Sequence, residues 1–167
     1  MKSLHILHTE AAAGWGGQEI RVLQESLLLL ERGHRVSLVC KANSPLEKYC
    51  RSISNPKFDF KPIPMKKAIN LRAFIDLYRY ISKNKFDVIH THSSTDSWLG
   101  GVVGKLLGVP VIRTRHVSLP VKDFFPNYLL YSYIPQRILT SGNMISNIVK
   151  KVRCVDSNRV VSISAGV

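Results

Sequence analysis

The chain has 167 residues, a length that suits one compact α/β domain able to bury a core without disulfides or metals. Its 24 lysines and arginines outnumber its 11 acidic residues, and the net charge of +13 indicates a polyanionic neighbour such as phosphate groups, an anionic membrane face or nucleic acid. Three widely spaced cysteines argue against a disulfide framework or a zinc site and favour a reducing cytoplasm, and no apolar run reaches the roughly 18 residues that span a bilayer.

The chain begins with an apolar run, residues 4–8, that predicts a strand, and the small and glycine-rich residues 11–17 predict a loop. Apolar side chains then recur at helical spacing between residues 18 and 32. Gly33 is placed to end this helix, because glycine readily adopts the left-handed backbone found just beyond helix ends. Residues 34–41 predict a second strand. The apolar stripe of the helix is Ile20, Leu23, Leu27 and Leu30.

The rest of the chain repeats this alternation of strand and helix. A helix is predicted over residues 70–83, and glycines within residues 96–107 suit a helix packed closely on a sheet. Residues 117–127 predict a functional or linking loop. Strands are predicted at 86–91, 110–114, 137–141 and 159–163, and a further helix at 144–153. This pattern predicts an α/β fold with a doubly wound, mostly parallel, Rossmann-like sheet, which binds ligands at the carboxyl ends of its strands.

The glycine loop lies between the first strand and the first helix. Its amides can approach an anion without interference from a Cβ atom and with a helix N-terminus behind them, so Gly16 and Gly17 are candidate phosphate-binding residues. Alternatively, these glycines make only a tight turn, with Glu19 favoured by the helix dipole. A nicotinamide dinucleotide fingerprint fits poorly, because Glu19 stands where its third glycine belongs and the second strand ends at Lys41 rather than at an acid.

Four motifs, in the expected order, resemble those of the family 4 glycosyltransferases and cover nearly the whole chain. They are GGQE with the leucine-rich helix and RGHRV after it (16–36), FDVIHTH (86–92), GVPVIRTRH (108–116) and NRVVSISAGV (158–167). In the last motif, Ser164 and Ala165 replace the usual Pro-Asn pair. The resemblance implies one half of a GT-B fold of two Rossmann-like domains, and a retaining, metal-independent transfer from a nucleotide-sugar without a cofactor.

On this resemblance, residues 1–167 are expected to form the N-terminal, acceptor-side domain, and the donor-binding C-terminal domain with its E-x7-E motif is expected to lie outside the chain. The fragment alone is therefore expected to be inactive. The whole enzyme is expected to move a sugar from a nucleotide-sugar to a glycan or lipid-linked acceptor in bacterial lipopolysaccharide or surface polysaccharide biosynthesis. Its expected location is the cytoplasm, with the anionic inner face of the membrane as a candidate docking surface.

Polar residues follow the predicted strand 86–91. His90 and His92 are two residues apart, so they are expected on one face of the sheet, with His92 at the carboxyl end where ligands bind. No metal is expected, because no third ligand stands at an obvious spacing. His92 with Ser93 or Ser94 is a candidate for acceptor binding, and the alternative is a strand end that is merely hydrogen-bonded.

Arg115 and His116 follow the strand 110–114 and are expected beside the same cleft. The resemblance implies a catalytic role for His116 against the transferred sugar, either as a neutral hydrogen-bonding imidazole or as a cation that assists the leaving phosphate. An exposed loop histidine is the alternative. Arg115 and Glu19 complete the residues expected to bind the acceptor or the sugar.

The segment 61–85 combines basic residues with an apolar, aromatic-bearing stripe, which suits an anionic membrane surface. The alternative is an ordinary helix that packs its stripe on the sheet and leaves a basic face in water. The basic residues are Lys61, Lys66, Lys67, Arg72, Arg79, Lys83 and Lys85, and the stripe is Leu71, Phe74, Ile75, Tyr78 and Ile81. Two rival functions remain open: a non-catalytic module for nucleic acid or another anionic partner, which lacks any recognisable nucleic-acid motif, and an NAD(P)-dependent enzyme.

Overall fold

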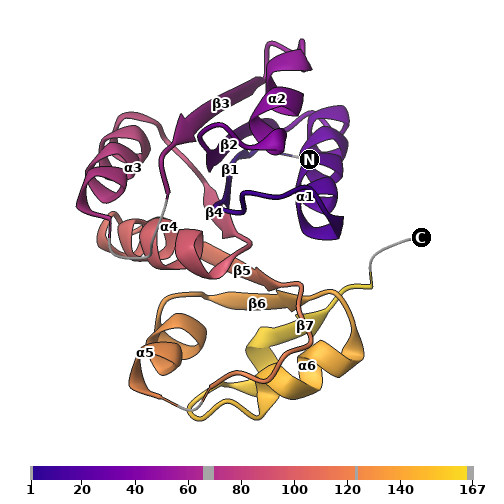
Figure 1. The fold of residues 1–167 in the computed structure, drawn as a ribbon, viewed down its shortest axis with the longest axis vertical. Coiled ribbons are helices and arrows are strands. Elements are labelled where there is room, and N and C mark those ends of the chain that lie inside the picture. Colours follow the sequence, from indigo (N-terminus) through magenta and orange to yellow (C-terminus); the bar gives the residue numbers. More distant parts are fainter. Residues whose placement is uncertain (1, 66–69, 123, 165–167) are drawn as a thin grey trace.

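A computed structural model describes residues 2–65, 70–122 and 124–164 of the chain. Seven strands form one parallel sheet in the order β3-β2-β1-β4-β5-β6-β7 (Figure 1). The strands are β1 (His5–Glu10), β2 (Arg35–Lys41), β3 (Phe58–Ile63), β4 (Val88–Thr91), β5 (Val111–Arg115), β6 (Arg137–Thr140) and β7 (Val160–Ser162). The predicted doubly wound, parallel sheet is therefore confirmed.

Helices cover both faces of the sheet, with α1 and α2 on one side of its first half and α3 and α4 on the other (Figure 1). The order of strands reverses between β1 and β4, and ligands of open α/β sheets bind at such a switch point. The helices are α1 (Gly17–Glu31), α2 (Pro45–Ser52), α3 (Leu71–Lys83), α4 (Ser94–Leu106), α5 (Phe125–Tyr128), the π-helical η1 (Leu129–Tyr133), α6 (Asn143–Lys150) and the 3-10 helix η2 (Ser157–Arg159).

The glycines of α4 explain how this helix packs on the sheet. A Cβ atom on Gly104 would lie 2.7 Å from a methyl group of Val111 on β5 and 2.8 Å from one of Ile89 on β4. A Cβ atom on Gly101 would lie 2.7 Å from Ile134. Close packing requires glycine at these positions, as the sequence predicted.

The buried faces of α1 and α3 differ from the predicted stripes. In α3 the buried side chains are Ala73, Leu77 and Ile81, whereas Leu71, Ile75 and Tyr78 are exposed. In α1 the buried set is Glu19, Val22, Ser26 and Leu30, and Ile20 and Leu27 are more than one-third exposed. Each helix is thus rotated relative to its most apolar stripe, so that the small side chains of Ala73 and Ser26 lie on the buried face.

Two elements in the first half were not predicted. α2 is a short helix that starts at Pro45, with the Ser44 hydroxyl accepting a hydrogen bond from the backbone N–H of Glu47. β3 is an edge strand with mixed polarity, so it lacks the apolar run of a central strand. The predicted loop 117–127 is shorter than expected, because α5 begins at Phe125.

The predicted basic segment 61–85 is described except for residues 66–69, which lie outside the described residues together with Lys66 and Lys67. Within it, α3 exposes Leu71, Ile75 and Tyr78 beside the exposed Arg72 and Arg79. None of the helices in the described ranges is both long and apolar enough to cross a bilayer.

Candidate functional site

Two adjoining cavities lie at the carboxyl edge of the sheet. The α1 cavity, of about 770 Å³, is lined by residues that include Gly17, Gln18, Arg21, Glu25, His116 and Ser141. The β5 cavity, of about 470 Å³, is lined by residues that include Gln18, Ser93, Arg113, Arg115, His116 and Tyr131. The structure therefore gathers the predicted residues Gly17, Ser93, Arg115 and His116 at one edge, and His116 lines both cavities.

The glycine loop provides the N-terminal cap of α1. Gly16 is the N-cap residue, and its backbone N–H donates to the Glu19 carboxylate over 2.7 Å. Glu19 is buried, so capping accounts for its position, and its predicted role in binding sugar remains a prediction. Gly17 lines the α1 cavity at the start of the helix, where an anion is favoured.

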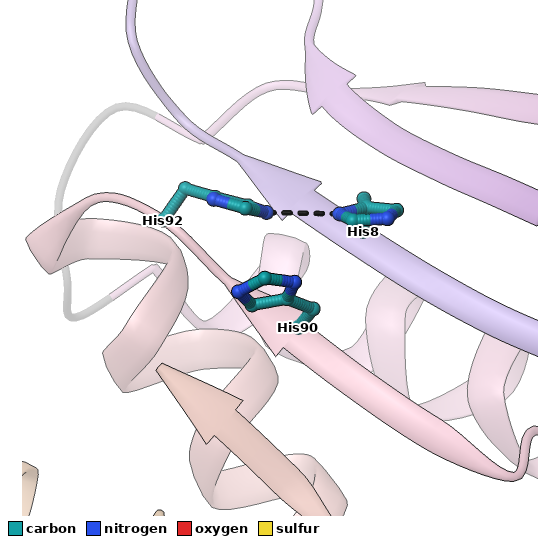
Figure 2. A group of neighbouring side chains, drawn as sticks. All are labelled: His8, His90 and His92. Carbon is teal, nitrogen blue, oxygen red and sulfur yellow. Dashed lines mark hydrogen bonds between the residues drawn. The ribbon is translucent and has the colours of Figure 1, made fainter. Parts of the chain in front are cut away.

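A chain of three imidazoles runs from the core to the cavities. His8 Nδ1 and His92 Nε2 are 2.9 Å apart and share a hydrogen bond (Figure 2). His92 Nδ1 in turn lies 3.3 Å from His116 Nε2. Burial, with a smaller effect of His90, lowers the pKa of His8 to about 3, and burial together with the neighbouring histidines holds the pKa of His92 well below 6.5. The imidazoles of His8 and His92 are therefore uncharged at neutral pH.

The same physical causes keep His116 neutral. Burial, followed by the positive charge of Arg21, lowers the pKa of His116 to about 4. Its Nε2 is held by His92, and its backbone carbonyl accepts a hydrogen bond from the Ser141 hydroxyl over 3.5 Å. His116 is partly buried rather than an exposed loop residue. At neutral pH the imidazole can hydrogen-bond a ligand, but it carries no positive charge.

His90 belongs to a second, linked set of contacts. Its Nε2 lies 2.5 Å from the Thr114 hydroxyl and its Nδ1 lies 3.3 Å from a carboxylate oxygen of Glu25 on α1. Burial by itself would raise the pKa of Glu25, but the hydrogen bond and charge of His90 outweigh it and bring that pKa to about 2. Glu25 is therefore a carboxylate that orients His90.

His8, His90 and His92 are also the described residues that could hold a metal ion, because one ligand atom from each lies within 4.8 Å of the others (Figure 2). The expected absence of a third ligand was thus wrong: His8 on β1 faces His90 across the β1–β4 pairing. However, two of the nitrogens already share a hydrogen bond, and His8 Nε2 is buried without a partner among the described residues. A metal ion could bind here only by displacing the hydrogen bond between His8 and His92.

The start of α4 is fixed by Asp96, which sequence reasoning missed. Its carboxylate accepts hydrogen bonds from the backbone N–H groups of His92 and Ser93, at 2.8 and 2.7 Å, and from the hydroxyls of Thr9 and Ser93. Burial raises the pKa of Asp96, and those hydrogen bonds oppose the rise. The Ser93-x-x-Asp96 spacing, a capping box, was the sequence signal that could have found it.

Two arginines on β5 converge on Tyr131. Arg113 donates from Nη2 to the tyrosine hydroxyl over 3.2 Å, and its guanidinium lies 4.4 Å from the centre of the ring. Arg115 donates from Nη1 to the same hydroxyl and from Nη2 to the Leu119 carbonyl. Arg115 was predicted as a site residue and Arg113 was not, because alternate residues of a central strand are normally buried and apolar.

Comparison with known proteins is consistent with this geometry. The model of Glycosyltransferase Family 4 matches residues 15–167. Over 134 residues, 70% of this chain, the sequence is 32% identical to the Escherichia coli UDP-Gal:alpha-D-GlcNAc-diphosphoundecaprenol alpha-1,3-galactosyltransferase, and the match covers 32% of that enzyme.

Solved structures show the same fold. A glycosyltransferase from Rickettsia africae superposes with a TM-score of 0.78 at 17% identity, over 100% of this chain and 44% of that one. Anabaena HepE in complex with UDP-glucose gives a TM-score of 0.78 at 11% identity, over 98% of this chain and 44% of that one. The chain thus spans less than half the length of these relatives. It has the Rossmann-like fold found in GT-B glycosyltransferases, and it belongs to glycosyltransferase family 4.

Proposed function

We propose that this chain is the acceptor-side, N-terminal domain of a retaining glycosyltransferase that moves a sugar from a nucleotide-sugar to a glycan or lipid-linked acceptor. Family membership supports sugar transfer. The name of the Escherichia coli relative specifies a UDP-sugar donor and a diphosphoundecaprenol acceptor, and HepE is seen with UDP-glucose. Because the chain covers 32% of that relative, the proposed activity belongs to the whole enzyme, with a C-terminal domain as the main donor-binding half.

The position of His116, which lines both the α1 cavity and the β5 cavity, carries this proposal. The α1 cavity has a helix N-terminus and Arg21 for the leaving diphosphate of the donor, and the β5 cavity has Ser93 and Arg115 for the acceptor. A sugar passing from one to the other meets the His116 imidazole. Since the pKa of His116 is about 4, we propose that it acts as a neutral hydrogen-bonding group rather than as a cation.

The chemistry proposed for this chain needs no metal ion. Negative charge on the leaving diphosphate would be met by the amides at the start of α1 and by Arg21, whose Nη1 is buried without a partner among the described residues. The net charge of +13 and the apolar and basic surface of α3 support docking at an anionic inner membrane surface, where lipid-linked acceptors reside. We place the enzyme in the cytoplasm, in lipopolysaccharide or surface polysaccharide assembly.

A transfer assay with the whole enzyme tests the proposal. A panel of nucleotide-sugars is incubated with the enzyme and a diphosphoundecaprenol-linked sugar, and the product is analysed by mass and by the NMR coupling of its new anomeric proton. We expect transfer from one donor, without added metal, and with the anomeric configuration of the donor kept. Inversion would contradict the retaining mechanism, and the lack of transfer from every donor would contradict the function.

A further inference from the structure

The β5 cavity contains buried cationic groups whose hydrogen-bond donors find no partner in the described protein. Arg113 is 4% exposed, and its Nε and Nη1 atoms are buried without a hydrogen-bond partner among the described residues. The same holds for Nε of Arg115. A buried guanidinium that lacks a counter-ion is strongly unfavourable, so its presence requires an explanation.

No carboxylate among the described residues forms an ion pair with Arg113. Asp96 is the acidic group that acts on Arg113 through space, but its oxygens bond to Thr9, His92 and Ser93. Neither ion pair found among the described residues involves an arginine of β5. Burial lowers the pKa of Arg113, and the Tyr131 ring with its hydroxyl only partly compensates.

The lining of the same cavity brings these groups together. Ser93 and Ser94 line the β5 cavity at the first turn of α4, where their hydroxyls can add hydrogen bonds to an anion. Arg113 and Arg115 bring two positive charges to the lining of this one cavity of about 470 Å³. Guanidinium groups bind phosphate oxygens through paired, charge-assisted hydrogen bonds.

We propose that the β5 cavity is a phosphate-binding site, with Arg113 and Arg115 as its principal ligands, and that it receives the diphosphate of the lipid-linked acceptor. The phosphate chemistry follows from the buried arginines alone, and the acceptor as its source rests on the proposed function. Because His116 lines both this cavity and the α1 cavity, a diphosphate held here places the acceptor beside the same imidazole that the donor meets.

Titration of the 167-residue chain with inorganic pyrophosphate, followed by calorimetry, tests the site. Arg113→Met keeps most of the packing on Tyr131, whose hydroxyl retains its bond to Arg115. We expect this substitution to weaken pyrophosphate binding about ten- to a hundredfold, the effect of losing a hydrogen bond to a charged group. Arg137→Met is the matched control, because Arg137 is an exposed residue at the opposite, amino end of β6, and we expect unchanged affinity.

Thermal unfolding separates a ligand site from a structural role. If Arg113 exists to bind an anion, the unliganded Arg113→Met variant should melt at the same temperature as the wild type or higher, and pyrophosphate should stabilise it less than it stabilises the wild type. A lower melting temperature together with unchanged pyrophosphate affinity would overturn the proposal, because Arg113 would then be only structural.

The source of the phosphate is tested with two further ligands, UDP and a short-chain prenyl diphosphate. We expect the prenyl diphosphate to depend on Arg113 and UDP to be insensitive to its substitution. The opposite dependence would overturn the assignment to the acceptor. These measurements use binding and not turnover, so they can fail while sugar transfer by the whole enzyme succeeds, and the reverse.

Discussion

Replacing His116 by alanine in the whole enzyme removes one imidazole from the point where the two cavities meet. An oxyanion-type donor is worth roughly 3 to 4 kcal/mol, or about a hundred- to a thousandfold in rate. We expect the lower end, about a hundredfold in kcat, because Arg21 and the start of α1, which we propose bind the leaving diphosphate, still line the α1 cavity. The substitution also leaves His92 Nδ1 without its partner, which costs at most about 1–3 kcal/mol and less where water can enter from a cavity.

The assay compares kcat, KM and melting temperature for the wild type, His116→Ala and His116→Gln. The glutamine amide can still bond to His92, so its melting temperature should match the wild type while kcat stays reduced. His34→Ala is the control, because His34 accepts from the Leu4 backbone N–H at the amino end of the sheet, and its kcat should be unchanged. Turnover of His116→Ala near that of the wild type would refute the catalytic role, and a collapsed melting temperature would make His116 structural.

The 167-residue chain alone should unfold cooperatively, transfer no sugar and bind a nucleotide-sugar only weakly. Sugar transfer by this chain, or a micromolar Kd for the nucleotide-sugar, would contradict the proposal that a C-terminal domain is the main donor-binding half. Anionic vesicles should bind the chain and release it as salt rises, Lys66→Glu with Lys67→Glu should weaken the binding, and equal binding to neutral vesicles would remove its electrostatic basis. His8 has a lowered pKa of about 3 in the folded chain, so unfolded histidine takes up protons first and stability falls as pH drops below about 6.5. For this one buried group the loss between pH 7 and pH 5 is about 2 kcal/mol, and urea unfolding of His8→Gln should show a pH dependence smaller by that amount; an identical dependence would contradict the buried, neutral state of His8.

The sequence was sufficient to predict most strands of the sheet, because the central strands of a parallel sheet are apolar on both faces and alternate with helices. It was insufficient at the edge, where β3 carries Asp59, Lys61 and Pro62 and shows no continuous apolar run. Helix rotation was also mispredicted. The most apolar stripe of α3 includes Leu71 and Tyr78, but these are exposed and the small Ala73 is buried instead.

The candidate site was predicted in part for a similar reason. His92, Ser93, Arg115 and His116 lie together because the carboxyl ends of neighbouring strands meet at one edge. His8 was missed, since it comes beside His90 only through the β1–β4 pairing, which joins residues far apart in the sequence.

Arg113 was missed for a different reason. Arg113 looked like an ordinary residue of a short strand, and only its burial without a carboxylate partner, among the described residues, reveals it as unusual.

Donor and acceptor are proposed to occupy two separate cavities that share His116 in their linings. The most direct test is a set of NMR chemical-shift maps of the isotope-labelled chain, recorded with a UDP-sugar and with a short-chain prenyl diphosphate, since such maps detect weak binding. We expect the UDP-sugar to shift the resonances of Gly17 and Arg21, the prenyl diphosphate to shift those of Arg113 and Ser93, and both to shift those of His116. If both compounds shifted the resonances of residues in the same cavity, or if neither shifted those of His116, the proposal that donor and acceptor occupy separate cavities would be contradicted.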